Sequence, residues 1–401
     1  MRIFVIGAGV SSLAFCSFLA NKNITVIESN KDSGRKLLAT GNGRCNFTNL
    51  KLSYENYYSK EKNFVNYSLD NFSNKDLINY FEYLGIDWAS LPSGRCYPKT
   101  MSAQSVKDSL MMKAEENAKF IFNEKIRDID FDKKLIISEN KKKYKYDILV
   151  IGSGGLTLKN SGSDGSILEI LKNHTKIEEI TYGITNFKAK NPLSKRANGV
   201  KVNARASLII DEKYKKSSQD DIIFQNYGLT GTAILDLSNE ISLALKDKKK
   251  VRLDIDFYPE YKKEGLLLKL EEKVKRFPQR SIEEILIGNL DKKLIIDIIK
   301  RAKINPREKN ISRNDLNKLV NVLKNLSFDI IDINDKKNAQ VSLGGVSCGE
   351  IDKKTMKSLK IKDCYFIGEV MDVAGDCGGY NIQWAFSSAK SASEDIRRLN
   401  V

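Results

Sequence analysis

The sequence predicts an α/β protein in which a parallel-sheet domain, formed by both ends of the chain, is interrupted by an antiparallel β domain and a small helical domain. Three patterns support this class. The N-terminus has a strand–helix–strand unit, the middle of the chain alternates apolar and polar residues, and a helical pattern follows before β-type residues return. At 401 residues the chain is long enough for two or three domains. We expect these domains at residues 1–178 with 342–401, at 179–261 with 327–341, and at 262–326.

The first half of the chain contains most elements of the parallel sheet. Ile3–Ile6 is predicted as a short apolar strand, Val10–Ala20 as a helix rich in small residues, and Ile24–Ile27 as a second strand that ends at Glu28. The pattern then predicts a loop-rich section to about Asn74, helices near Asp76–Leu84 and Ser102–Ala118, and strands within residues 119–138 and 144–151.

The second half contains the two insertions. The alternation in residues 200–210 (VKVNARASLII) is typical of an antiparallel barrel or sandwich. After about residue 330 the composition is β-type again, so we expect the chain to rejoin its first domain there. Two serine–acid pairs in the helical segment have the spacing of capping boxes, namely Ser281 with Glu284 and Ser312 with Asp315.

The N-terminal unit carries a dinucleotide fingerprint, Gly7-x-Gly9-x-x-Ser12. The first glycine permits a tight turn, and the second lets the backbone approach a pyrophosphate at the helix N-terminus. Ser12 stands where a third glycine is usual. Glu28, about 20 residues on, is placed to accept hydrogen bonds from a ribose, and its charge would repel the 2′-phosphate of NADP. The pattern therefore indicates a Rossmann-like unit.

Two further glycine-rich stretches belong to the same half. Residues 33–49 (SGRKLLATGNGRCNFTN) offer cations and donors that suit phosphate and ribityl hydroxyls. Residues 152–155 (GSGG) imitate a second fingerprint, but Thr157 stands at its third position and no acid follows about 20 residues later. We interpret them as a strand end that passes close to the first nucleotide, and not as an independent NAD site.

A glycine-rich loop near the C-terminus, GDCGGYN at residues 375–381, leads from a strand-like run into a helix. Ligands of such sheets bind at the carboxyl ends of the strands, so we expect this loop at the same crevice as Gly7. The amides after Gly379 are expected to stabilise negative charge on a reduced flavin ring. A bulky side chain at Gly379 would have to fit where the ring packs and would push this backbone away. Asp372 or Glu369 would bind ribityl hydroxyls.

Composition limits the classes of function. The net charge is +16, but the lysine run at residues 246–250 has no interleaved aromatic residue and that at 140–145 has only Tyr144, so we interpret both as solvated loops and do not favour a nucleic-acid partner. The apolar runs are far shorter than the ~18 residues of a membrane span, and no signal-peptide pattern precedes the first strand. Six dispersed cysteines and a single histidine indicate a reducing, cytoplasmic environment and no metal site.

Five stretches together resemble the BaiN-like family of bacterial FAD-binding oxidoreductases, also described as aminoacetone-oxidase-like flavoproteins. The resemblance spans essentially the whole chain and implies a split FAD-binding domain with inserted β and helical domains. This chain departs from the family's usual residues at Ser12, at Gly152-Ser153 and at Lys159. The stretches are GRKLLATGNGRCNFTN (34–49), GRCYPKT (94–100), YGLTGTAILDLS (227–238), LGGVSCGEIDKKTMKS (343–358) and GEVMDVAGDCGGYNIQWAFSS (368–388).

The motifs and the resemblance together imply FAD contacts at both ends of the chain. The expected cofactor-binding residues are Gly7, Gly9, Ser11, Ser12, Glu28, Arg35, Lys36, Gly41, Asn42, Gly43, Arg44, Cys45, Asn46, Ile126, Gly152, Gly154, Gly155, Gly368, Glu369, Asp376, Gly379, Tyr380 and Asn381.

Candidates for catalysis are Arg95, Tyr97 and Cys377. Arg95 suits an acidic substrate and Tyr97 suits proton donation, but both equally suit support of the FAD loops. Cys377 and Cys45 are interpreted as small buried residues. We expect an enzyme that moves hydride or electrons between a small organic substrate and FAD and is re-reduced by transiently bound NAD(P)H. An aminoacetone-type amine oxidase that uses oxygen and a flavin-dependent RNA-modifying or RNA-binding protein are the alternatives.

Overall fold

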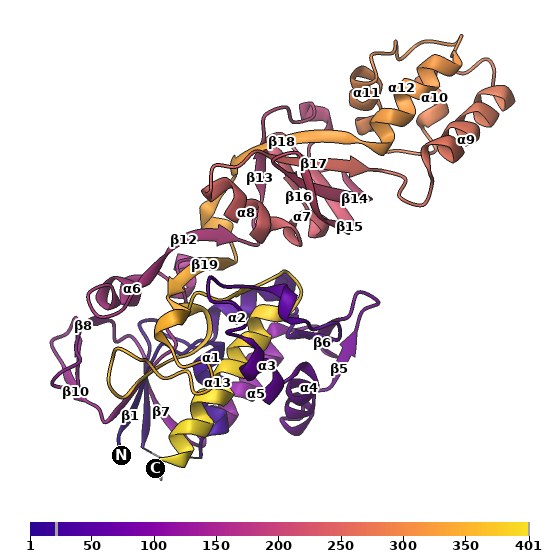
Figure 1. The fold of residues 1–401 in the computed structure, drawn as a ribbon. Helices are drawn as coiled ribbons and strands as arrows, with labels where there is room; N and C mark the ends of the chain where they lie inside the picture. Colours follow the sequence, from indigo (N-terminus) through magenta and orange to yellow (C-terminus); the bar gives the residue numbers. More distant parts are fainter. Residues whose placement is uncertain (21–22, 400–401) are drawn as a thin grey trace. The chain divides into compact units, whose positions relative to one another are not determined.

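The computed structural model describes residues 1–20 and 23–399, and this part of the chain divides into two compact units. Unit 1 combines Met1–Gly183 with the C-terminal part that begins at Lys337, and unit 2 is Ile184–Lys336. Both ends of the chain, indigo and yellow in Figure 1, thus belong to one unit. The predicted α/β class and its split sheet domain are confirmed.

A five-stranded parallel sheet forms the centre of unit 1. Its order is β20-β11-β1-β2-β7, which places a C-terminal strand beside strands from the first half of the chain. Every residue of β1 and β11 is buried, as expected of parallel strands that are covered on both faces. The strands are β1 (Ile3–Ile6), β2 (Ile24–Ile27), β7 (Ala118–Ile121), β11 (Ile148–Ile151) and β20 (Cys364–Phe366).

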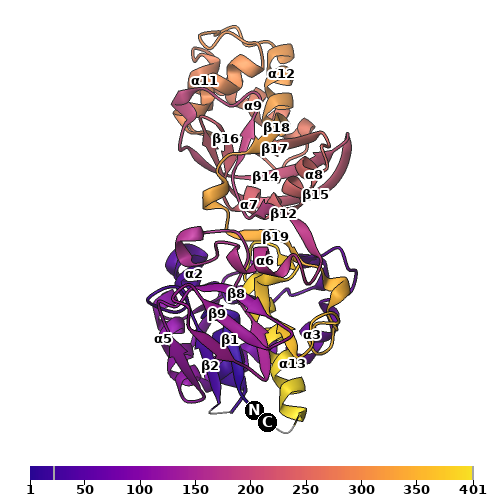
Figure 2. The ribbon, with the colours of Figure 1, turned by 90° about the vertical axis from the view of Figure 1, so that its left-hand side faces the viewer.

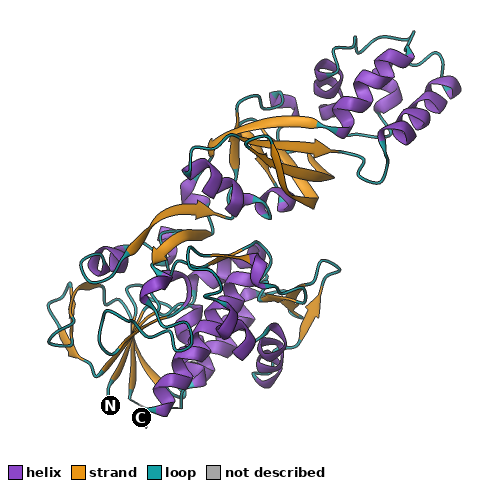
Figure 3. Ribbon diagram, in the orientation of Figure 1, coloured by secondary structure: helices purple, strands orange, loops and turns teal. Residues whose placement is uncertain are grey.

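Helices and a small antiparallel meander cover this sheet. Helix α1 (Val10–Phe18) packs against α5 (Ala103–Glu115) and α13 (Tyr380–Arg398), which explains why nearly all its residues are buried. The three helices lie together on one side of the fan of strands (Figure 3). The meander lies on the opposite side (Figure 2). Its strands are β8 (Ile126–Asp130), β9 (Leu135–Ser138) and β10 (Lys143–Lys145).

The remaining elements of unit 1 are short. Its other helices are α2 (Arg35–Ala39), α3 (Asn66–Asn71), α4 (Asn74–Tyr83) and α6 (Ser166–Leu171). Three small sheets complete it: β3 (Thr48–Asn49) with β6 (Arg95–Pro98) and β5 (Trp88–Ser90), β4 (Tyr57–Tyr58) with β21 (Ala374–Gly375), and β12 (Ile177–Gly183) with β19 (Val341–Val346).

Unit 2 contains a closed antiparallel barrel in the order β13-β16-β15-β14-β17-β18. Closure leaves none of these strands with an unpaired edge. The predicted strand at 200–210 is β14, which pairs with β15 on one side and β17 on the other. The strands are β13 (Phe187–Ala189), β14 (Lys201–Ile210), β15 (Lys213–Gln225), β16 (Gly228–Thr230), β17 (Val251–Asp256) and β18 (Leu326–Ile333).

The helices of unit 2 include those that the sequence predicted. Both capping boxes are confirmed, because the hydroxyls of Ser281 and Ser312 accept the amides of Glu284 and Asp315. Among the described residues, no helix has the length and apolar character that crossing a membrane requires. The helices are α7 (Thr232–Leu235), α8 (Ser238–Lys246), α9 (Lys263–Arg276), α10 (Ile282–Leu286), α11 (Lys292–Arg301) and α12 (Arg313–Lys324).

Candidate functional site

The turn after β1 leaves space at the N-terminus of α1. Gly7 has φ +89°, and a Cβ there would lie 2.8 Å from the Gly152 carbonyl oxygen, so the turn itself requires glycine. Gly9 is different: it is the N-cap of α1 with φ −75°, and the nearest described atom to a Cβ would be the Gly152 oxygen at 3.9 Å. Neither strain nor packing explains glycine at position 9. Close approach of an anion to the free amides of α1 would explain it.

Glu28 is buried at the end of β2 and holds the turns on both sides of it. Its Oε2 accepts the Ala8 amide at 2.7 Å. Its Oε1 accepts the backbone amide of Asn30 at 2.8 Å and the side-chain amide at 2.7 Å. The sequence predicted only a ribose partner, so this structural role was missed. A carboxylate offers about four lone-pair positions, which leaves capacity for a ribose hydroxyl.

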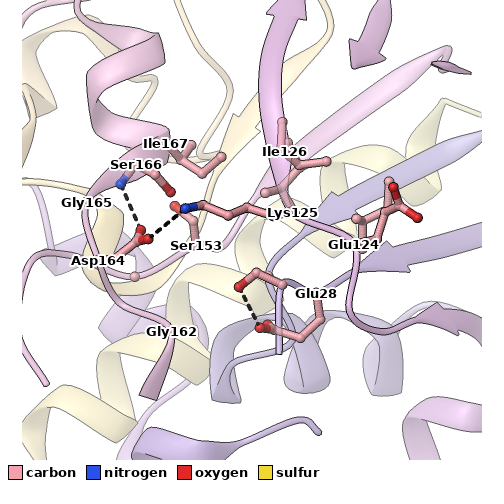
Figure 4. Close-up of a pocket in the computed structure, with 15 residues that line it drawn as sticks. Glu28, Glu124, Lys125, Ile126, Ser153, Gly162, Asp164, Gly165, Ser166 and Ile167 are labelled. Atoms are coloured by element: carbon pink, nitrogen blue, oxygen red, sulfur yellow. Dashed lines mark hydrogen bonds and ion pairs between the residues drawn. The ribbon is translucent and has the colours of Figure 1, made fainter. Parts of the chain in front are cut away.

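A pocket opens beside Glu28 (Figure 4). The hydroxyls of Ser153, in its wall, and of Ser163, beside Gly154, are buried without a hydrogen-bond partner among the described residues. Buried polar atoms are normally bonded, so these hydroxyls and the carboxylate fit a polar ligand such as an adenosine ribose. The pocket is lined by Ile6, Gly7, Ile27, Glu28, Ser29, Glu124, Lys125, Ile126, Ser153, Gly154, Gly162, Asp164, Gly165, Ser166 and Ile167.

Sequence reasoning named Ile126 in this wall but missed its neighbours. Lys125 lies 3.7 Å from the Asp164 carboxylate, which also accepts the Ser166 amide at 2.9 Å (Figure 4). A hydrogen bond from Lys142 lowers the pKa of Glu124, so this buried wall residue is ionised. The available signal was position: Glu124 and Lys125 follow β7, whose carboxyl end must lie at the same edge of the sheet as that of β2.

The second glycine-rich stretch packs onto the first fingerprint. A Cβ on Gly152 or Gly155 would collide with the hydroxyls of Ser12 and Ser342 respectively. The strand that follows, β12, pairs antiparallel with β19 and does not extend the parallel sheet. No second strand–helix–strand nucleotide unit is therefore built on this stretch.

The predicted cation Lys36 and the predicted acid Glu369 pair with each other. The ammonium of Lys36 also donates to the Thr157 hydroxyl at 2.9 Å, and Glu369 accepts the Ser342 amide at 2.9 Å. Arg35, the neighbouring cation on α2, donates to the side chain of Asn30. These charges tie α2 to the C-terminal part of unit 1. Their contacts with FAD stay a prediction.

The turn at residues 41–45 is wound into left-handed backbone. Gly41, Asn42, Gly43 and Cys45 all have φ between 56° and 80°. Gly43 has only the Leu38 oxygen near its Cβ position, at 3.8 Å. The turn therefore presents backbone atoms outward, which suits a loop that lies against a ligand.

Three motifs that are distant in sequence meet beyond this turn. Thr48 and Asn49 of β3 pair with Cys96 and Arg95 of β6, and the side chain of Asn49 donates to the Gly378 oxygen at 3.1 Å. Two further contacts belong to the same cluster: the Arg44 guanidinium lies 5.2 Å from the centre of the Tyr97 ring, and the buried Oδ1 of Asn46 has no hydrogen-bond partner in the described chain. An unpartnered buried acceptor fits an N–H or O–H of a bound cofactor.

The C-terminal loop requires a correction. Gly379 is the N-cap of α13 with φ +100°, and a Cβ there would lie 2.5 Å from the Thr48 oxygen. The chain's own backbone therefore excludes a side chain, and the predicted reason, a clash with a ligand ring, is wrong. Asn381 likewise uses its side chain internally, since it accepts the Gly375 amide at 2.8 Å and donates to the Gly375 oxygen at 2.9 Å.

The other predicted C-terminal residues also have internal contacts. The Tyr380 oxygen accepts the Tyr57 hydroxyl at 3.0 Å, and the Asp376 amide donates to the Asn56 oxygen at 2.8 Å. A Cβ on Gly368, which has φ +70°, would lie 2.8 Å from Ser11. The chain after β20 therefore packs closely against α1, the helix that begins beside Gly9.

The cysteines offer no disulfide. None of the six forms a disulfide, and burial raises the pKa of Cys45 to about 12, so its thiol is protonated at neutral pH. Cys377 is partly exposed. Over residues 1–20 and 23–399, no group of histidine, cysteine or acidic side chains could hold a metal ion.

Comparison with known proteins places the chain among Rossmann-domain proteins. The family model described as the HI0933-like protein Rossmann domain matches residues 1–395. A ribosomal RNA dihydrouridine synthase from Escherichia coli is 29% identical over 98% of this chain and 97% of its own length. A 3-dehydro-bile acid delta(4,6)-reductase from Clostridium scindens is 27% identical over 96% and 97%. A solved 3-ketosteroid delta1-dehydrogenase from Sterolibacterium denitrificans aligns over 99% of each chain, with 11% identity and a TM-score of 0.47.

Proposed function

This chain belongs to the HI0933-like Rossmann family, and we propose that it is a FAD-dependent reductase of a carbon–carbon double bond conjugated to a carbonyl group. Membership confirms the family resemblance and the enzyme class, a FAD-dependent oxidoreductase, that the sequence predicted. The acceptor, the electron donor and a cytoplasmic location are parts of the proposal.

The observation that carries the cofactor is the open space at Gly9. Glycine is needed at that N-cap only if something outside the described chain approaches the first amides of α1. A pyrophosphate would receive those amides and the positive end of the helix dipole. The adjoining pocket, with Glu28 and the Ser153 hydroxyl that has no partner among the described residues, suits the adenosine half of the same molecule.

The remaining polar groups suit the other half of FAD. Asn46 offers a buried oxygen without a partner among the described residues, and Gly379 provides no side-chain cap at the start of α13. Free amides at a helix start stabilise negative charge near them. When bound, FAD supplies a ring that accepts two electrons and delivers them to an acceptor as hydride.

The names of two curated relatives support reduction of an activated double bond. A delta(4,6)-reductase of a 3-dehydro steroid and a dihydrouridine synthase have different acceptors, but both names describe hydrogen added to a ring double bond that is conjugated to a carbonyl. Such a reduction adds hydride to the β carbon and a proton to the α carbon. In this chain we assign the proton to the Tyr97 hydroxyl and carbonyl binding to the Arg44 guanidinium, which lie together beside Asn46.

We propose NADH or NADPH as the electron donor. The second glycine-rich stretch packs onto the first fingerprint, so the donor would bind transiently and without a Rossmann unit of its own. The amine oxidase predicted as the alternative would instead be reduced by its substrate and reoxidised by oxygen.

A uracil ring in RNA is a second candidate acceptor. It is favoured by the net charge of +16 and by the dihydrouridine synthases from E. coli and Haemophilus influenzae, the latter 28% identical over 98% of this chain. A small molecule and an RNA base would undergo the same chemistry. An RNA acceptor would in addition need a surface of the protein that binds the rest of the RNA.

Anaerobic absorbance at 450 nm tests the proposal. Purified protein reconstituted with FAD should be bleached by NADH or NADPH, and addition of a cyclic enone or of a uridine-containing RNA should restore the absorbance. Tyr97→Phe should slow the restoration and leave the bleaching unchanged. Bleaching by an amine, with restoration only by oxygen, would establish the oxidase and overturn the proposed reductase.

A further inference from the structure

Two lysine-rich turns that are distant in sequence meet at one end of the unit 2 barrel. One is the end of the β14–β15 hairpin, the turn at residues 211–212 with the first residues of β15, and the other is the α8–β17 turn at residues 247–250. The Asp211 amide donates to the Lys250 oxygen at 3.0 Å, and the Asp211 carboxylate accepts the Lys250 amide at 3.0 Å. These reciprocal bonds fix the turns side by side. We name as the lysine rim Lys213, Lys215, Lys216, Lys248, Lys249 and Lys250.

The strand register explains why the turns meet. Ile210, the last residue of β14, pairs with Lys213 of β15 on one side and with Val251 of β17 on the other. Figure 1 shows these three strands side by side. The β14–β15 register shifts after Leu208, and the shift leaves Lys215 without a partner opposite it. Such a bulge turns the strand end outward and exposes the side chain there.

The acids near the rim leave most of its charge uncompensated. Glu212 pairs with Arg252 at 2.7 Å, and Asp247 pairs with Lys249 at 3.1 Å. The Asp211 carboxylate accepts the backbone amide of Lys250. In the described part of the chain no acid pairs with the exposed side chains of Lys213, Lys215, Lys248 or Lys250. Four free cations on two adjoining turns form a surface for a polyanion.

An exposed aromatic ring lies among these cations. Tyr214, between Lys213 and Lys215, is 63% exposed, and its hydroxyl bonds to the Ser217 hydroxyl at 3.2 Å. The run at 246–250 has no aromatic residue of its own, and the barrel brings Tyr214 to it from another strand. Proteins bind single-stranded nucleic acids with this arrangement, in which the aromatic ring stacks on a base and the cations contact phosphates.

We propose that the lysine rim and Tyr214 bind a single-stranded segment of RNA, with the lysines at phosphates and the tyrosine stacked on a base. This inference rests on the proposed function at one point: the surface would dock the acceptor if the acceptor is an RNA. It needs neither flavin chemistry nor a particular acceptor base. A membrane surface is disfavoured because no apolar side chain other than Tyr214 is exposed at the rim among the described residues.

Binding of a labelled oligouridylate of about 12 nucleotides, a length within the range such surfaces cover, tests the lysines. The variant Lys213→Ala/Lys215→Ala/Lys248→Ala/Lys250→Ala is compared with a control that removes the same charge from unit 1, Lys75→Ala/Lys119→Ala/Lys143→Ala/Lys145→Ala. Like the rim positions, the control lysines are exposed. Fluorescence anisotropy is measured between about 50 and 200 mM salt.

The rim variant should bind at least about tenfold more weakly than wild type, and its log–log salt slope should be shallower by roughly 2 to 3, about 0.7 for each phosphate that the variant no longer neutralises. The control should stay within about twofold of wild type, because its charges lie elsewhere. Equal losses of affinity in the two variants would show attraction by net charge alone and overturn the proposal. Circular dichroism and flavin content should be unchanged in both.

Tyr214 separates stacking from charge. Tyr214→Ala should weaken binding about fivefold or more without changing the salt slope, and Tyr214→Phe should restore wild-type affinity. If the rim variant no longer binds phosphatidylserine vesicles but still binds RNA as wild type does, the rim is a membrane site and the proposal is overturned. Bleaching by NADPH and restoration by a free enone involve no RNA, so their failure would refute the proposed reductase and leave this inference standing.

Discussion

Gly9 and Gly379 both cap the start of a helix in unit 1, yet glycine is needed at the two positions for different reasons. At Gly9 the backbone has an ordinary φ of −75°, and a side chain would meet only one described atom, at 3.9 Å. At Gly379 φ is +100°, and a side chain would be pressed to within 2.5 Å of the Thr48 backbone. Two motif glycines that look alike in sequence thus separate into one with open space beside it, which we assign to the proposed FAD, and one required by the fold.

Gly379→Ala should produce the largest effect and should act on the protein without cofactor. The left-handed backbone costs about 1–2 kcal/mol for any other residue, and the overlap with Thr48 adds a further ~1–3 kcal/mol. Urea unfolding of the apo protein measures the sum.

Gly85→Ala is the matched control, since Gly85 has φ +76° and no atom within 4 Å of its Cβ position. It should lose only the backbone part, about 1–2 kcal/mol. If both variants lose the same stability, packing against Thr48 is not what requires glycine at position 379.

Gly9→Ala should reverse this pattern. A helix N-cap change of this kind costs under about 1 kcal/mol, so the apo protein should unfold almost as wild type. The added methyl group would stand between the α1 amides and a pyrophosphate, and the affinity for FAD in calorimetric titration should fall at least about tenfold, or ~1.4 kcal/mol. Wild-type affinity in this variant would break the comparison, because the open space would then have no ligand.

The sequence predicted the fold class and its local features, and missed the specific contacts between distant residues at the site. The strand–helix–strand unit and the capping boxes depend on residues a few positions apart, so their patterns were sufficient. The pairing of Lys36 with Glu369 and of Thr48 with Cys96 joins residues that only the tertiary fold brings together. The reason for glycine at position 379 was misread for the same cause, because the atom that excludes a side chain belongs to Thr48.

Glu28→Gln should lower both the stability of the apo protein and the affinity for FAD moderately. Its effect is therefore intermediate between those of the two glycine variants. The amide cannot accept on both sides, so the bonds from Ala8 or Asn30 are lost and the apo protein should lose roughly 1–3 kcal/mol. The ribose also loses a charged acceptor, and FAD affinity should fall about tenfold.

Asn30→Ala distinguishes the two contributions. It removes the side-chain donor at 2.7 Å from Glu28 and leaves the carboxylate in place. We expect a similar loss of apo stability with less than about threefold loss of FAD affinity, below ~0.7 kcal/mol. Equal losses of affinity in the two variants would mean that Glu28 only supports the turn.

The smallest effects are expected at two cysteines, Cys45 in the turn at residues 41–45 and Cys377 in the loop that precedes Gly379. Burial raises the pKa of Cys45 to about 12, so the nucleophilic thiolate is scarce until the pH approaches that value. Cys377 is partly exposed and forms no disulfide. Iodoacetamide should therefore label Cys377 in the folded protein and Cys45 only after unfolding, as mass spectrometry of the digested protein would show. Cys45→Ala and Cys377→Ala should each change the rate of flavin bleaching by NADPH less than about twofold, well under 1 kcal/mol of barrier. A tenfold loss of rate in either variant would show that its thiol takes part in electron transfer, and that the loop carrying that cysteine supplies chemistry in addition to the proposed cofactor binding.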